Sequence, residues 1–165
     1  MTKAALTPEF RISFCNLFQP KANMNGRLQF DVEMMFAKPV TAASMAELKL
    51  AHDGAIKPAW IHGNEEYRKF GSIFVDGDKK KQASRKGNLL LKAWSSSEYP
   101  PKLVMPNPRI IATNRDIYPG CFARAILTPF HYEHKNEAGH IVSRGVAFGL
   151  HTVQKTRDGD PLTNV

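Results

Sequence analysis

In the stretch 27–36, every second residue is apolar, and the residues between them are polar except Met35. Such a period of two indicates a β-strand with one buried face and does not fit a helix. A second alternating stretch, 10–18, precedes it, and Asn25-Gly26 between the two strongly favours a hairpin turn. The sequence therefore predicts an antiparallel strand pair, and the rest of the chain must be arranged around it.

Further strands are expected at 88–95, 117–132 and 145–153, with short pieces near 103–105 and 110–112. Gln19-Pro20 is expected to end the first strand, because proline cannot donate to a β-ladder. On the strand 117–132, parity assigns Phe122 and Ile126 to the core, and Pro129 suggests a bulge or an edge position. Five or six antiparallel strands predict a mainly β protein, a small closed or partly open barrel.

Residues 41–70 are expected to form a helical insertion between strands. Thr41 can cap a helix, Met45 and Leu48 follow at helical spacing, and Gly54 can end it. A second, shorter helix is expected within 55–69. The chain 1–165 has the length of one domain.

The formal net charge is +8 and the pI is near 9.6, which favours a polyanionic partner. Much of this charge lies in 76–87, DGDKKKQASRKG, a polar stretch with little apolar content that is predicted to be a flexible basic loop. Its cations are Lys79, Lys80, Lys81, Arg85 and Lys86. Most such runs are solvated faces, but a mobile basic loop can also close over a phosphate backbone.

No apolar run approaches the roughly 18–20 residues of a membrane span, so no membrane partner is expected. The N-terminal MTKAALTPEF lacks the apolar region of a signal peptide. The two cysteines, Cys15 and Cys121, lie in strand-like apolar runs and are expected to be buried free thiols. A cytosolic location follows from these features.

Lys92 and Trp94 share the strand face opposite Leu91 and Ala93. A base can stack on such an indole while the ammonium meets a phosphate. The alternative is that the helical insertion covers the tryptophan and that the lysine stem runs beside it. Alternation alone leaves the two interpretations evenly matched.

The closing strand offers small residues and cations. Gly145 and Gly149 lack side chains, so another molecule, single-stranded DNA in our interpretation, can approach the backbone there. Lys155 and Arg157 are expected to extend the path of the basic loop.

Three residues of the strand 117–132 are further candidates. Arg124 is expected at the barrel rim or on the ligand rather than in a dry core. Phe130 and Tyr132 are weaker stacking candidates near the following loop.

A metal site has little support. The nearest candidate set is His131, His134, His140 and Cys121. Its spacing does not match a structural zinc site, and polar loop histidines are the better interpretation.

Catalysis has little support either. Asp76 and Asp78, with Glu65, could serve a metal-dependent nuclease, but no histidine or third carboxylate accompanies the aspartate pair. The sequence has neither a P-loop nor a nucleophile elbow. No enzyme and no cofactor are therefore predicted.

Three blocks of the chain match a family. Residues 16–21 read Asn-Leu-Phe-Gln-Pro-Lys, residues 118–125 read Tyr-Pro-Gly-Cys-Phe-Ala-Arg-Ala, and 145–150 read Gly-Val-Ala-Phe-Gly-Leu. The last block continues with Val-Gln-Lys at 153–155 and Arg-Asp-Gly-Asp-Pro-Leu at 157–162. Together they resemble the single-stranded DNA-binding proteins of tailed bacteriophages. The resemblance spans most of the chain, whereas 41–87 agrees only in general layout.

The resemblance implies an OB-fold barrel that coats single strands in the host cytoplasm during phage replication, recombination and repair, without catalysis or a required metal. It also implies that strand-face aromatics and cations bind the DNA. Many such proteins end in an acidic tail that recruits replication proteins, whereas this sequence ends in Leu-Thr-Asn-Val at 162–165. Recruitment of phage or host replication proteins by that route therefore has no support in this sequence.

The predicted function is sequence-tolerant binding of single-stranded DNA. The predicted contact residues are Lys79, Lys80, Lys81, Arg85, Lys86, Lys92, Trp94, Tyr99, Lys102, Arg124, Phe130, Tyr132, Lys155 and Arg157. The alternatives are a nuclease or other DNA-processing enzyme, and an RNA-binding or structural phage protein. The sequence leaves open the oligomeric state and the preference between single- and double-stranded DNA.

Overall fold

The computed structural model describes residues 4–162 and is mainly β, which confirms the predicted fold class. Its strands are β1 (Ala5–Leu6), β2 (Phe10–Ala22), β3 (Leu28–Ala37), β4 (Val75–Asp76), β5 (Asn88–Ser96), β6 (Lys102–Val104), β7 (Phe122–Lys135) and β8 (Ile141–Arg157). Its helices are α1 (Ala42–Gly54), α2 (Pro58–His62) and the 3-10 turns η1 (Phe70–Ile73), η2 (Gly77–Lys79) and η3 (Ala83–Arg85). Residues 163–165, the last three of the C-terminal Leu-Thr-Asn-Val, lie outside the described range.

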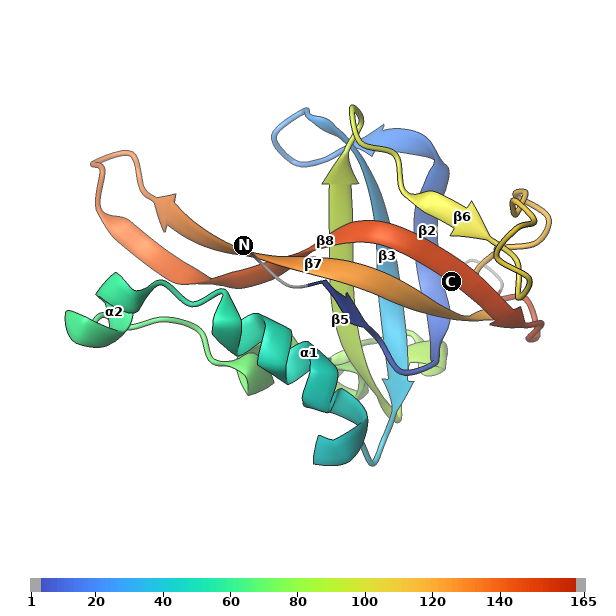
Figure 1. Cartoon of the computed structure of the whole chain (residues 1–165), viewed down its shortest axis with the longest axis horizontal. Coiled ribbons are helices and arrows are strands. Elements are labelled where there is room, and N and C mark those ends of the chain that lie inside the picture. Colours follow the sequence, from blue (N-terminus) through green and yellow to red (C-terminus); the bar gives the residue numbers. More distant parts are fainter. Residues whose placement is uncertain (1–3, 163–165) are drawn as a thin grey trace.

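Five of these strands close a barrel (Figure 1). β2 pairs with β3, β3 with β5, β5 with β8 and β8 with β7, and β7 pairs back with β2. All these pairs are antiparallel except β5 and β8, where Trp94 lies opposite Gly149 in a parallel pair. The five barrel strands, numbered 1 to 5 in chain order, are β2, β3, β5, β7 and β8. Around the barrel their order is 1-2-3-5-4 and back to 1, which is the OB-fold arrangement.

β2 continues through Gln19-Pro20, so the prediction that this dipeptide ends the strand is wrong. The proline interrupts the ladder instead, because pairing with β3 stops after Asn16 and resumes only at Lys21. The predicted hairpin turn is confirmed, and Gly26 has the positive φ, 78°, that such a turn requires.

The assignment of Phe122 and Ile126 to the core is wrong. Ala123, Ala125 and Leu127 of β7 are buried inside the barrel, whereas Phe122 and Ile126 are half-buried on its outside. Large side chains from the neighbouring strands fill the interior, so β7 can place mainly small residues there.

A bulge redirects the second half of β8. The β7–β8 ladder skips His151, and the extra residue reverses the alternation. Val153 therefore joins Leu150 in the core, although the sequence places them on opposite faces. Pro129, for which a bulge or an edge position was predicted, stays in register with Phe148 of β8. Within the described residues β7 pairs with no other strand at this point, so the edge position is the alternative that holds.

The two helices lie along one side of the barrel, with α2 beneath the long β7–β8 hairpin that projects from it (Figure 1). α1 begins as predicted, since Thr41 Oγ1 accepts a hydrogen bond from the Ser44 amide at 3.1 Å. Met45 and Leu48 of α1 pack into the core. No helix within 4–162 is long and apolar enough to cross a membrane.

Both cysteines have perturbed thiols. Cys121 is buried and Cys15 half-buried, and burial raises the pKa of each, that of Cys15 to about 12. At pH 8 only about 10⁻⁴ of Cys15 is then thiolate, the nucleophilic form. We therefore expect the native protein to resist iodoacetamide at pH 8, and both thiols to react once urea unfolds the chain. Intact-mass spectrometry counts the adducts, and rapid labelling of the native protein would contradict the assignment.

Candidate nucleic-acid interface

A groove of about 430 Å³ lies on the outer surface of the barrel. β5 and β8 form its floor, the projecting part of β7 forms one wall, and residues of 68–80 form the other. The predicted contact residues that it brings together are Lys80, Lys92, Trp94, Phe130 and Tyr132. They come from three separate parts of the chain, so the tertiary fold assembles this site.

Trp94 and Phe130 form an aromatic pair in the groove. Their ring centroids are 5.7 Å apart and their planes are 88° apart. Each residue is 37% exposed, so the helical insertion does not bury the indole. The pair therefore offers the kind of exposed aromatic surface on which a nucleobase stacks.

The two glycines of β8 differ in how closely other residues approach them. A Cβ on Gly145 would lie 3.0 Å from the Tyr132 hydroxyl and 3.0 Å from Arg68 Cβ. A Cβ on Gly149 would lie 3.4 Å from the Thr128 carbonyl oxygen and 3.9 Å from the Phe130 ring, which are ordinary contact distances. The expectation of bare backbone is therefore wrong at Gly145, where Tyr132 and Arg68 occupy the space, and it stays a prediction at Gly149.

Lys92 lies beside a buried ion pair that the sequence did not reveal. Its partner across the β3–β5 ladder is Glu33, which is only 3% exposed and whose Oε1 is 2.8 Å from Arg85 Nε. Lys92 Nζ and Arg85 Cζ lie 5.4 Å and 5.9 Å from the centroid of the Phe14 ring. Arg85 is therefore neutralised inside the fold and is not the free loop cation that was predicted, whereas Lys92 remains exposed.

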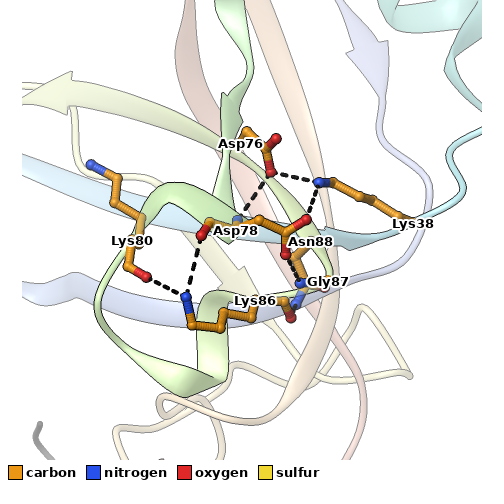
Figure 2. A network of polar contacts seen from close by, with 7 residues as sticks. All are labelled: Lys38, Asp76, Asp78, Lys80, Lys86, Gly87 and Asn88. Atoms are coloured by element: carbon orange, nitrogen blue, oxygen red, sulfur yellow. Dashed lines mark hydrogen bonds and ion pairs between the residues drawn. The ribbon is translucent and has the colours of Figure 1, made fainter.

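Residues 76–87 contain more structure than the predicted loop, since η2 and η3 both lie within them. Figure 2 shows how Lys38 holds this segment at its start: Lys38 Nζ is 2.5 Å from Asp76 Oδ1 and 2.8 Å from Asp78 Oδ2. Asp78 Oδ1 in turn accepts a hydrogen bond from the Gly87 amide at 2.7 Å. Asp78 thereby connects the start of the segment to its end. Whether the residues between these points are flexible stays a prediction.

The lysines of this segment differ in their availability. Lys86 Nζ donates to the carbonyl oxygens of Asp78, at 3.2 Å, and Lys80, at 3.0 Å, as drawn in Figure 2. Lys79, Lys80 and Lys81 are exposed, and Lys80 lines the groove. Lys86 therefore forms hydrogen bonds within the segment 76–87, whereas the other three lysines of the segment present their ammonium groups to solvent.

The Lys38 network gives a pH prediction. Hydrogen bonds from Lys38, and then from backbone amides, hold the pKa values of Asp76 and Asp78 below their ordinary range. Their contribution to stability is thus complete above the unfolded carboxyl pKa of about 3.9 and is lost as pH falls through the lowered values. We expect the Gly87 amide resonance to follow this titration in NMR spectra, and Lys38→Met to move the midpoint upward. An unchanged midpoint in that variant would contradict the network.

Two predicted contact residues at the end of β8 are engaged elsewhere. Lys155 is 7% exposed, and its Nζ is 2.5 Å from Asp158 Oδ1. Burial lowers the pKa of Lys155, but the hydrogen bond to Asp158 and the charges of Asp158, Tyr118 and Cys121 together outweigh it, and the net pKa is raised. Arg157 pairs with Glu9 at 3.1 Å and covers the Phe122 ring at 3.7 Å. The buried Lys155 ammonium therefore does not form the predicted surface path with Arg157.

Three other predicted contact residues are exposed but do not line the groove. Arg124 Nε donates to Gln154 Oε1 at 2.7 Å on the outside of β7. Lys102 lies on β6, and Tyr99, 72% exposed, lies in the turn that follows β5.

The helical insertion supports the β7 wall, a role that the sequence did not show. Trp60 of α2 is 3% exposed, and its Nε1 donates to Glu133 Oε1 at 3.1 Å. Its ring stacks on Tyr67, at 5.9 Å between centroids. The Arg68 amide donates to the Arg144 carbonyl oxygen at 2.8 Å, which fixes Arg68 at the edge of β8. Residues 64–70 have no clear periodicity, so no sequence signal marks this contact.

The acidic residues proposed for the nuclease alternative have cationic partners. Asp76 and Asp78 contact Lys38, and Glu65 Oε2 is 3.3 Å from Arg144. In the part of the chain that the structure describes, no group of three or more His, Cys, Asp or Glu is placed to hold a metal ion.

Solved structures with the same fold come from bacteriophages. The single-stranded DNA-binding protein of bacteriophage Enc34 in complex with ssDNA superposes with a TM-score of 0.73 at 16% identity, over 97% of this chain and 89% of that chain. Its C-terminal truncation gives a TM-score of 0.70 at 16% identity, over 96% and 88%. Gp2.5, a single-stranded DNA-binding protein of bacteriophage T7, gives 0.63 at 13% identity over 100% of both chains.

A search of curated protein sequences finds no match. A family model does match, over residues 3–165, and it describes the ssDNA-binding protein of Enterobacter phage Enc34. The match covers nearly the whole chain, including the blocks at 16–21, 118–125 and 145–162. The chain therefore belongs to the family of the ssDNA-binding protein of Enterobacter phage Enc34.

Proposed function

We propose that this protein binds single-stranded DNA in the groove, with little sequence preference, and coats it during phage DNA replication, recombination and repair in the host cytoplasm. The carrying observation is the exposed Trp94–Phe130 pair beside the exposed lysines Lys92 and Lys80. Aromatic faces accept any base, and cations meet any phosphate, so this combination gives affinity without reading sequence. Membership of the Enc34 family supports the same function.

Single-stranded rather than duplex DNA fits the groove. Stacking on Trp94 requires a base whose face is free, and a base pair inside a duplex has both faces stacked on its neighbours. The walls formed by β7 and by residues 68–80 further restrict access to the floor. We accordingly assign the protein a binding role without catalysis, in a single OB-fold domain (1–165) with a helical insertion at 41–70.

The test is titration with poly-dT, followed by tryptophan fluorescence across a salt series. We expect quenching, and a logarithmic fall in affinity with salt of slope about −0.7 per phosphate contacted. Competition with duplex DNA and with poly-rU ranks the affinities for the three nucleic acids, and we expect poly-dT to bind most tightly. Loss of full-length oligonucleotide on adding Mg²⁺ would favour the nuclease, and no binding at low salt would overturn the proposal.

A further inference from the structure

The interruption in β2 produces a second surface feature on the barrel. Four residues, 17–20, lie opposite the single residue Phe30 of β3, between the pairs Asn16–Asp31 and Lys21–Gln29. Pro20 has no amide to donate, and the residue before a proline is held extended, so the ladder cannot close here. The chain therefore bulges outward for the length of this segment.

The bulge turns one aromatic ring into solvent. Leu17 is 3% exposed and belongs to the core, whereas its neighbour Phe18 is 37% exposed, the same fraction as Trp94. Phe18 lines a hollow of about 410 Å³ together with Asn16, Gln19 and Asn114. The side-chain amides of these three residues carry donors and acceptors of the kind that meet base edges.

The hollow lies on the same outer face of the sheet as Trp94. Asn16 lies opposite Asp31 in β2 and β3, and Asp31 lies opposite Trp94 in β3 and β5, so the three form one row across the sheet. Neighbouring strands are about 4.8 Å apart, which places the β2 end of this row roughly 10 Å from Trp94. The Asn16 amide holds Asp31 at 2.7 Å, and the exposed Lys21 supplies a cation beyond Phe18.

We propose that Phe18 is a second stacking platform, which takes a nucleobase of the same single strand that occupies the groove. The inference rests on the proposed function and extends it by a subsite. Gln19 and Asn114 border the base, and Lys21 meets the adjacent phosphate. The strand therefore crosses β5, β3 and β2 between Trp94 and the bulge.

The first experiment compares affinities for a labelled dT oligonucleotide by fluorescence anisotropy. Phe18→Ala is expected to weaken binding about 5- to 150-fold, the range for loss of one stacked base. Phe18→Leu should lose a similar factor because it keeps apolar volume without a ring, and Phe18→Trp should retain wild-type affinity. Met24→Ala is the matched control, because Met24 is fully exposed in the adjoining turn and should change affinity less than twofold.

The second experiment places a reporter at the site. In a Trp94→Phe, Phe18→Trp variant, Trp60 remains buried, so any quenching at DNA saturation reports on position 18. Quenching supports the subsite. Unquenched fluorescence at saturation, or Phe18→Ala within twofold of wild type, overturns it. One result would refute the subsite alone: the wild type binds DNA, Trp94→Ala weakens binding and Phe18→Ala does not. A wild-type protein that binds no DNA would instead refute the proposed function itself.

Discussion

Trp94→Ala is expected to weaken the binding of single-stranded DNA by about 1–3 kcal/mol, or roughly 5- to 150-fold. The indole is 37% exposed and packs edge-on against Phe130, so its removal takes away one stacking face and loosens the other. Most of the fluorescence quenching should disappear with it, since Trp60 is 3% exposed and hydrogen-bonded to Glu133. Titration at two salt concentrations checks both effects.

The salt dependence separates stacking from charge. Trp94→Ala should leave the slope of affinity against salt unchanged, whereas Lys92→Ala should reduce its magnitude by about 0.7, the value for one phosphate contact. Tyr99→Ala is the matched aromatic control, because Tyr99 is 72% exposed but does not line the groove. A loss as large for Tyr99→Ala as for Trp94→Ala would place the stacking surface outside the groove.

Arg85→Ala is expected to lower the free energy of unfolding by about 3–5 kcal/mol, because it leaves a buried charge without its partner. Glu33 is 3% exposed, and Arg85 provides its one ion-pair contact within residues 4–162, at 2.8 Å. Urea unfolding measures the difference. The double variant Glu33→Leu, Arg85→Met should recover most of the loss, since apolar residues of similar volume often replace a buried ion pair without penalty.

Lys81→Ala is the control for this prediction. Lys81 is an exposed cation of the same segment, and a surface substitution of this kind usually changes stability by less than about 0.5 kcal/mol. Equal effects for Arg85→Ala and Lys81→Ala would show that the ion pair contributes nothing. Because Lys80 lines the groove from this segment, we also expect Arg85→Ala to weaken DNA binding.

The strands, the hairpin at Asn25-Gly26 and the cap at Thr41 could be predicted from the sequence, because each depends on neighbouring residues. Alternation also placed Trp94 and Ala93 on opposite faces of β5, which has no bulge, but it left open whether the helical insertion covers the indole. Phe122 and Ile126 were assigned to the wrong side, and Val153 shares the core with Leu150 although alternation places the two on opposite faces. Alternation gives the two faces of a strand but does not say which faces inward, and a one-residue bulge exchanges them.

The sequence by itself determined a basic, mainly antiparallel β protein with an aromatic residue and a cation on the same face of β5, because periodicity and charge are local properties. Only the tertiary structure decided which cations are exposed to solvent and which are held in ion pairs within the fold. All three of Lys155, Arg85 and Lys92 are cations in polar or strand segments, yet the fold buries Lys155 beside Asp158 and holds the half-buried Arg85 in an ion pair with Glu33. Each cation meets its carboxylate through a turn or through packing across strands. A buried charge without such a partner would cost too much free energy, so the two charges are buried as pairs.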